Sequence, residues 1–242
     1  DLHPRVRRQR QMCIRDRLYI VEGDSALGSV KMARNAEFQA VIPVRGKILN
    51  CLKADYDKIF KNEIITDLIK VIGCGVEVKT GKNKEISMFN LDNLRWNKIV
   101  ICTDADVDGF HIRTLILTML YRLVPTLIEK GYVYIAESPL FEITTSDKTY
   151  FAYDENEKTK ILKMIGNKKF DIQRSKGLGE NEAEMMSLTT MDPATRRLIK
   201  IEPDDIEQTQ WMFDMLLGDD LQGRKDFITN NGVDYLDMAD IS

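Results

Sequence analysis

The stretch that decides the fold is residues 98–109, Lys-Ile-Val-Ile-Cys-Thr-Asp-Ala-Asp-Val-Asp-Gly. Its first half is a short run of β-branched and apolar residues, which is typical of a buried strand. Its second half places three carboxylates, Asp104, Asp106 and Asp108, at alternating positions directly after that strand. A helical pattern then continues to about Lys130 and tolerates a proline or kinks at it. The stretch therefore predicts a strand that leads through an acidic turn into a long helix.

The same strand, turn and helix arrangement occurs near the start of the chain. Residues 18–22, Leu-Tyr-Ile-Val-Glu, form an apolar run that ends on a carboxylate, and a helical pattern follows from Gly23 to about Arg34. Further elements alternate in the same way, with strands predicted at 38–44 and 132–136 and helices at 56–61 and 63–72. This alternation indicates an α/β fold with a Rossmann-like, mostly parallel sheet flanked by helices. Because ligands of such sheets bind at the carboxyl ends of the strands, we expect Glu22 and the aspartates to meet at one edge.

The composition changes after Glu137. The residues that follow are polar, with short β-type runs at 150–153 and 170–173 around one helical stretch at 155–165. Two further helical stretches are predicted at 204–217 and 221–229. We therefore expect a main domain at 18–137 and a smaller mixed α/β tail subdomain at 138–242.

Length and composition exclude several classes of protein. The 242 residues are 43% hydrophobic and 30% charged, enough for a sizeable core, so a disordered chain is excluded. The apolar runs are far shorter than the ~18 residues of a membrane span, so we expect no membrane partner. Four cysteines without a C-x-x-C pair indicate free thiols in a reducing compartment, and hence a cytoplasmic protein.

The charge is unevenly distributed. Residues 1–17 contain six arginines and two aspartates, and without this +4 leader the net charge of −3 becomes −7. We interpret the leader as a sequence artefact and leave it out of the fold. An acidic body does not bind nucleic acid through its overall charge, so contact with DNA would need a local basic patch.

The acidic turn predicts a metal site. Packing Asp104, Asp106 and Asp108 beside Glu22 is electrostatically unfavourable unless a cation neutralises them. Carboxylate oxygens are hard ligands, which favour Mg²⁺, with Mn²⁺ or Ca²⁺ as substitutes. An alternative role for Asp108 is the N-cap of the helix before Gly109.

Other families share parts of this pattern. A stand-alone magnesium phosphatase of the haloacid dehalogenase class is one alternative, with Asp104 as nucleophile and Asp106 as acid/base after the apolar strand. The later acidic motif of that class would have to be 218–220, which follows a predicted helix instead of a strand. An EF-hand loop is excluded because Leu115 stands where the bidentate glutamate is required. A non-catalytic calcium-binding or scaffold module is the third hypothesis.

Five motifs occur in one order along the chain: Glu-Gly-Asp-Ser-Ala at 22–26, Pro-Val-Arg-Gly-Lys-Ile-Leu-Asn at 43–50, Thr-Asp-Ala-Asp-Val-Asp-Gly-Phe-His-Ile-Arg-Thr at 103–114, Lys-Gly-Leu-Gly-Glu at 176–180 and Thr-Thr-Met-Asp-Pro at 189–193. Together they resemble the Toprim region and carboxyl-terminal segment of type IIA DNA topoisomerase B subunits, the family that includes those of DNA gyrase and topoisomerase IV. The resemblance covers residues 18–242. It leaves open which of these two kinds the chain is.

The resemblance implies a Toprim fold and a Mg²⁺-dependent site that cleaves and religates double-stranded DNA. A partner A subunit would supply the attacking tyrosine, in an assembly with two copies of each subunit. It implies Glu22 as general acid/base and metal ligand, Asp104 and Asp106 as metal ligands, and Asp108 as a ligand or supporting carboxylate. It also implies DNA contacts for Lys47 and Asn50, and Arg45 lies beside them in the basic stretch 45–50. His111 and Arg113 open the helix after the acidic turn. His111 is either a site residue or a hydrogen-bonded structural group, and Arg113 is either a site residue or a cation that neutralises nearby carboxylates. Lys176 is a further candidate to face DNA or the metal site.

The chain also departs from the family pattern. Leu27 stands where the family usually has glycine and Val30 where it has alanine, so we expect the first helix to pack differently. No segment before Leu18 resembles the family's ATPase region. We therefore expect ATP to be bound and hydrolysed only by a longer parent protein.

Overall fold

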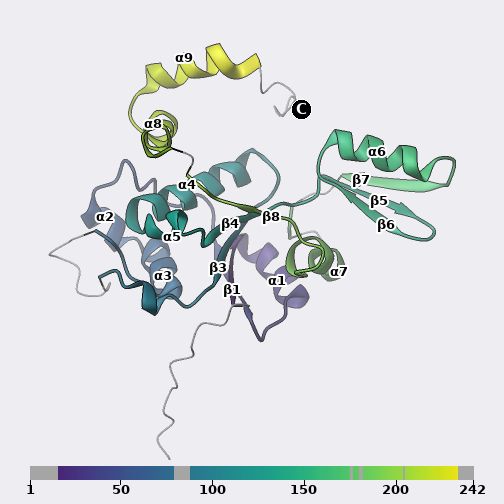
Figure 1. The fold of residues 1–242 in the computed structure, drawn as a ribbon, viewed down its shortest axis with the longest axis horizontal. Helices are drawn as coiled ribbons and strands as arrows, with labels where there is room; N and C mark the ends of the chain where they lie inside the picture. The colour runs from purple at the N-terminus through teal and green to yellow at the C-terminus, as the bar shows by residue number, and fades with distance from the viewer. Residues whose placement is uncertain (1–15, 79–87, 175–176, 180–181, 204, 234–242) are drawn as a thin grey trace, which may run out of the picture.

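The structure is a computed structural model that describes residues 16–78, 88–174, 177–179, 182–203 and 205–233. Its centre is a five-stranded sheet in the order β2-β1-β3-β4-β8 (Figure 1). The strands are β1 (Arg17–Glu22), β2 (Gln39–Val44), β3 (Lys98–Cys102), β4 (Val133–Ala136) and β8 (Leu198–Lys200). The first four are parallel, and β8 pairs antiparallel with β4. The predicted α/β fold with a mostly parallel sheet is confirmed.

Helices cover both faces of this sheet (Figure 1). One face packs against α2 (Tyr56–Lys61), α3 (Glu63–Ile72), α4 (Val107–Leu123) and α5 (Thr126–Glu129). The other packs against α1 (Gly23–Ala33), the short α7 (Ala183–Met186) and a π-helical turn, η2 (Ser187–Met191). The predicted helices at 56–61 and 63–72 are confirmed, and the first helix ends one residue earlier than predicted.

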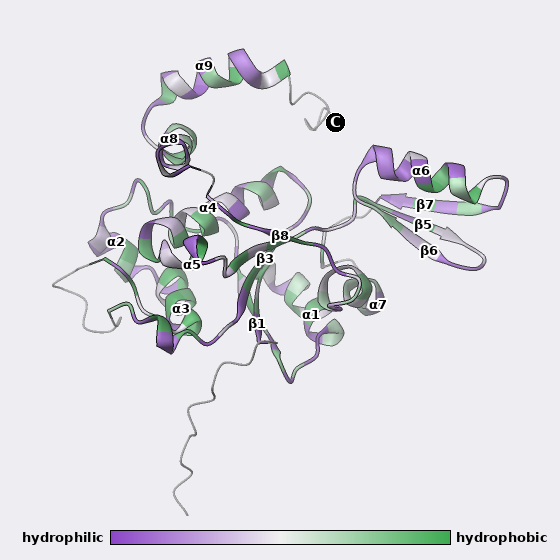
Figure 2. Ribbon diagram, in the orientation of Figure 1, coloured by the Kyte–Doolittle hydropathy of each residue, from purple (hydrophilic) through white to green (hydrophobic). Residues whose placement is uncertain are grey.

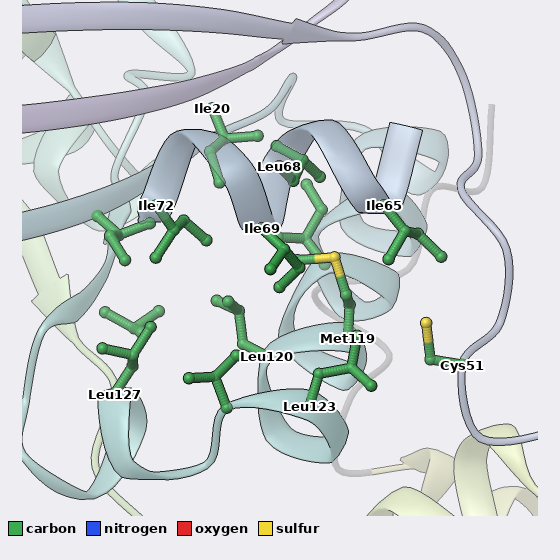
Figure 3. Packing of buried hydrophobic residues seen from close by; sticks show 14 of the residues in the cluster. Ile20, Cys51, Ile65, Leu68, Ile69, Ile72, Met119, Leu120, Leu123 and Leu127 are labelled. Carbon is green, nitrogen blue, oxygen red and sulfur yellow. The ribbon is translucent and has the colours of Figure 1, made fainter. Parts of the chain in front are cut away.

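The alternation of side chains along the strands explains the two layers, because successive residues of a strand point to opposite faces. Leu18 and Ile20 lie in the larger core, whereas Tyr19 and Val21 lie in the smaller one. Figure 3 shows the larger core, where side chains of α3 point toward those of α4 beneath Ile20. Burial on both faces accounts for the continuous apolar runs that predicted these strands.

The predicted long helix from residue 108 to about 130 is divided in two. α4 ends at Leu123, Val124 leaves the helical region with φ −148° and ψ 56°, and α5 starts at Thr126. Pro125 has no N–H to donate, and its ring disfavours helical backbone at the preceding residue. The proline therefore ends the helix instead of bending it.

After the main sheet the chain forms a second, smaller unit. Strands β5 (Phe141–Thr145), β6 (Thr149–Ala152) and β7 (Phe170–Arg174) make an antiparallel sheet in the order β6-β5-β7, and α6 (Glu155–Ile165) packs on it. This unit projects from the main sheet in Figure 1. The predicted runs near 150–153 and 170–173 and the helix at 155–165 are confirmed, whereas the central strand β5 was not predicted.

The chain then returns to the main domain. Leu178, Met186 and Met191 lie in the smaller core, and β8 adds the fifth strand to the sheet. The carboxyl-terminal helices α8 (Ile206–Leu217) and α9 (Leu221–Asn231) lie beyond α4 in Figure 1, and Figure 2 shows that both mix hydrophobic with hydrophilic residues. The sequence predicted both helices but not the return of this segment to the sheet.

Two further observations concern the predicted leader and the predicted absence of a membrane span. Arg17, the last residue of the predicted leader, is the first residue of β1, and residues 1–15 lie outside the described residues. Of the helices described, none has the length and apolar character needed to cross a membrane.

Candidate functional site at the carboxyl ends of β1 and β3

Two of the predicted site carboxylates are brought together by strand pairing. β1 and β3 are parallel neighbours in which Val21 pairs with Cys102, so both strands end at the same edge of the sheet. Glu22 is the last residue of β1, and Asp104 follows β3 by two residues. The backbone N–H of Asp104 donates a hydrogen bond of 3.2 Å to Oε2 of Glu22. The predicted meeting of these two residues is therefore observed.

The other two aspartates belong to the start of α4. Asp106 is the N-cap, and its Oδ1 accepts a 2.7 Å hydrogen bond from the N–H of Gly109. Asp108 lies in the first turn, where Oδ1 is 2.7 Å from Nζ of Lys47. The alternative of Asp108 as N-cap is therefore wrong, because the helix starts at Val107 and leaves Asp106 in the capping position. We call Glu22, Asp104, Asp106 and Asp108 the acidic edge.

A close packing contact fixes the acidic turn against α4. A Cβ placed on Gly109 would lie 2.2 Å from the carbonyl oxygen of Asp104, well inside the 3.0 Å that Cβ contacts normally exceed. Only a residue without a side chain allows the turn to approach the helix this closely. Gly109 thereby determines the position of Asp104 relative to α4.

The carboxylates of the acidic edge influence one another's protonation. Partial burial of Glu22 raises its pKa, and the negative charges of Asp104, Asp106 and Asp108 raise it further. The hydrogen bond from the Asp104 N–H acts in the opposite direction without cancelling the shift. The hydrogen bond and charge of Lys47 lower the pKa of Asp108. The pKa of Glu22 is thus raised while that of Asp108 is lowered, and a raised carboxyl pKa suits a general acid.

The four carboxylates of the acidic edge have the chemistry and the charge to bind a hard divalent cation. The donor set consists of carboxylate oxygens. Burial is the largest cause of the raised pKa of Glu22, and the charges of the other carboxylates add to it, a repulsion that a bound cation would relieve. As the side chains lie, no three Asp, Glu, His or Cys groups among the described residues are close enough to hold one ion. Joint coordination therefore requires some of these side chains to rotate.

The basic stretch lies beside the acidic edge. Arg45 Nε is 2.9 Å from Oδ2 of Asp24, with both side chains exposed, and Lys47 pairs with Asp108. Gly46 between them has φ +74°, a left-handed conformation that favours glycine. The positively charged side chains of Arg45 and Lys47 therefore lie next to the predicted metal site, on a surface open to a large ligand.

The remaining predicted residues differ in position. The Asn50 side chain donates to the carbonyl of Leu217 at 3.0 Å and accepts from the N–H of Leu52, so its amide joins the basic stretch to the end of α8. His111 is exposed on α4, and its charge contributes to the lowered pKa of Asp108. Arg113 is half-buried, with its guanidinium 5.0 Å from the ring centroid of Phe110. The prediction for Lys176 falls outside the described residues.

One hydrogen bond to the site was not predicted from the sequence. The N–H of Leu178 donates a 2.7 Å hydrogen bond to Oδ1 of Asp104. The two residues are 74 positions apart, and Leu178 reads in the sequence as an ordinary core residue. The neighbouring glycines in Lys-Gly-Leu-Gly-Glu were the available signal, since glycines around one apolar residue indicate a close backbone approach.

A parallel sheet with clustered carboxylates at the ends of two adjacent strands defines the class of the protein. The chain belongs to the Toprim domain family, whose model matches residues 17–138. A second family model, described as DNA gyrase B subunit, carboxyl terminus, matches residues 167–229.

DNA gyrase B subunits are among the curated proteins to which the chain is similar. The chain is 44% identical over 216 residues to the DNA gyrase B subunit of Thermotoga maritima, which covers 89% of this chain and 32% of that protein. It is 46% identical over 214 residues to that of Mycoplasmoides gallisepticum and 43% over 211 residues to that of Archaeoglobus fulgidus, covering 88% and 87% of this chain and 32% of each relative. The chain thus spans about a third of the length of these relatives. The matches give no support to the phosphatase alternative.

Proposed function

We propose that this chain is the metal-binding half of a type II DNA topoisomerase cleavage and religation site. Its substrate is double-stranded DNA, its metal is Mg²⁺, and a partner A subunit supplies the attacking tyrosine. The observation that carries the proposal is the contact between the Asp104 N–H and Glu22, which joins two strand ends of a Toprim domain into one acidic site. The similarity to gyrase B subunits supports the same activity.

Glu22, Asp104 and Asp106 would hold the metal ion, with Asp108 as a further carboxylate. When bound, a divalent cation neutralises charge on the scissile phosphate. Glu22 would supply the proton chemistry, donating from its carboxyl group to the leaving 3′-oxygen. In the reverse reaction the same carboxylate accepts that proton.

Arg45, Lys47 and Asn50 would face the DNA backbone. Arg45 and Lys47 pair with exposed aspartates, and such surface pairs contribute little free energy, so phosphate groups can replace these partners. Asn50 lies further along the same stretch, against the end of α8. Binding through these contacts should weaken as the salt concentration rises.

The attacking tyrosine would come from the partner. Tyr19 is fully buried, and its hydroxyl accepts a hydrogen bond from Arg196. Tyr134 lies on β4 under the ammonium of Lys98. Burial therefore makes Tyr19 unavailable as a nucleophile, and Tyr134 is partly buried against the smaller core. We also propose a cytoplasmic location, and ATP hydrolysis by a longer form of the protein only.

Mg²⁺-dependent cleavage of duplex DNA by this chain mixed with a gyrase-type A subunit tests the proposal. Protein-linked breaks trapped with denaturant should form with the wild-type chain and disappear in Glu22→Gln and Asp106→Asn. Asp92→Asn is the matched control, because Asp92 is an exposed acid in the turn before the amino end of β3, at the opposite edge of the sheet. Failure to cleave in a demonstrably assembled complex, with phosphomonoester hydrolysis that survives Glu22→Gln, would favour the phosphatase alternative instead.

A further inference from the structure

Three residues of the carboxyl-terminal region, Gly177, Leu178 and Gly179, lie against the acidic edge. We call them the Gly-Leu-Gly segment. The Leu178 side chain is 2% exposed and packs in the smaller core with Tyr19 and Val21 of β1. This anchoring holds the segment on the main domain, although it follows the projecting β5–β7 unit in sequence.

The segment holds the carboxylate of Asp104 from two directions. The Leu178 N–H donates to Oδ1 over 2.7 Å. A Cβ on Gly177 would lie 2.7 Å from Oδ2 and 3.3 Å from Cγ of the same carboxylate. An alanine at position 177 would therefore force the Asp104 carboxylate to turn away from the segment.

The other end of the segment is packed against α1. A Cβ on Gly179 would lie 2.5 Å from Cβ of Ser25, and the Ser29 hydroxyl donates to the Gly179 carbonyl at 3.4 Å. The segment is thus seated between the first turns of α1 and the acidic turn, with a glycine at each point of close approach.

The hydrogen bonds continue from this segment into the site. Leu178 donates to the Asp104 carboxylate, and the Asp104 N–H donates to Glu22. A displacement of the segment would therefore be transmitted to both residues. Partners that orient a ligating carboxylate typically change metal affinity about 10- to 100-fold when removed.

We infer that the Gly-Leu-Gly segment is a positioning clamp: the Leu178 N–H fixes one oxygen of Asp104 and so sets the orientation in which this carboxylate binds a divalent cation. The inference rests on the proposed function for the role of that cation. It makes Leu178 and Gly177 positioning residues, which act through Asp104 and do not touch the metal or the DNA.

Two changes to the segment test the clamp. Gly177→Ala places a methyl group against the Asp104 carboxylate, and an ester in place of the Gly177–Leu178 peptide bond removes only the N–H donor. Gly28→Ala is the matched control, because Gly28 lies in α1 with no atom within 4 Å of an added Cβ. The first measurement is the affinity of the chain alone for Mn²⁺, and the second is the Mg²⁺ midpoint of DNA cleavage with an A subunit.

We expect Gly177→Ala and the ester each to weaken Mn²⁺ binding and raise the Mg²⁺ midpoint by about 10- to 100-fold, with the control within about twofold of wild type. Should the alanine variant fail to fold, the ester decides alone. Unchanged Mn²⁺ affinity and an unchanged Mg²⁺ midpoint in the ester protein, or a wild-type chain that binds no Mn²⁺, would overturn the clamp. Normal Mn²⁺ binding without any DNA cleavage by the wild-type complex would contradict the proposed function and leave the clamp standing.

Discussion

Gly109→Ala should damage the site without touching any carboxylate. The added Cβ would lie 2.2 Å from the carbonyl oxygen of Asp104 and 3.0 Å from its backbone nitrogen. Because both neighbours are backbone atoms, neither can rotate away as a side chain could. The acidic turn must therefore move away from α4 by about 1 Å, and Asp104 moves with it.

The expected magnitudes follow from that displacement. Overpacking of this kind costs roughly 1–3 kcal/mol of the free energy of unfolding. For a chain of this size it lowers the melting temperature by about 2–12 °C. A shift of about 1 Å in a catalytic group costs roughly 100-fold in rate. DNA cleavage should therefore fall about 100-fold at a temperature where the variant is still folded.

The assay is thermal denaturation followed by DNA cleavage with a gyrase-type A subunit at saturating Mg²⁺. Gly28→Ala is the control, since it puts the same methyl group into open space on a helix and should raise stability by roughly 0.5–1 kcal/mol. Wild-type cleavage rates in a folded Gly109→Ala chain would refute the assignment of Gly109 as the residue that positions Asp104.

Three further predictions concern the neighbouring residues. Glu22→Gln should raise the melting temperature at pH 7 but not at pH 4, because an acid whose pKa is raised by folding destabilises the folded chain only once it ionises; equal differences at both pH values would contradict this. Lys47→Ala should change the free energy of unfolding by less than about 1 kcal/mol, because its ion pair with Asp108 is exposed. It should also lower the slope of log DNA affinity against log salt concentration by about one phosphate contact. An unchanged slope would exclude a contact between Lys47 and phosphate. Asn50→Ala should cost roughly 0.5–1.5 kcal/mol and speed amide exchange in α8, since it removes the bond to Leu217; unaltered exchange would show that this bond does not hold the helix.

The sequence predicted those features that depend on local pattern. Apolar runs bounded by turns predicted the four parallel strands, and parallel pairing implied that Glu22 and Asp104 would meet, as the structure shows. These inferences succeed because each one needs only a few neighbouring residues and the geometry of a parallel sheet.

Other features depend on contacts between distant parts of the chain. Three alternating aspartates can each cap a helix, and the structure shows that Asp106 accepts the hydrogen bond from the Gly109 N–H. Strand β8 is three residues long and forms by pairing with β4, so its own sequence carries little signal. The hydrogen bond from Leu178 to Asp104 joins residues 74 positions apart. No periodicity in the sequence indicates such a pairing.

The most direct test of the central claim is to identify which polypeptide becomes linked to DNA. End-labelled duplex DNA is incubated with this chain, a gyrase-type A subunit and Mg²⁺, and the proteins are separated under denaturing conditions. A site divided between the two polypeptides predicts that the label is found on the A subunit and not on this chain. It also predicts that labelling requires this chain with Glu22 intact. Label on this chain, or undiminished label on the A subunit with Glu22→Gln, would contradict it.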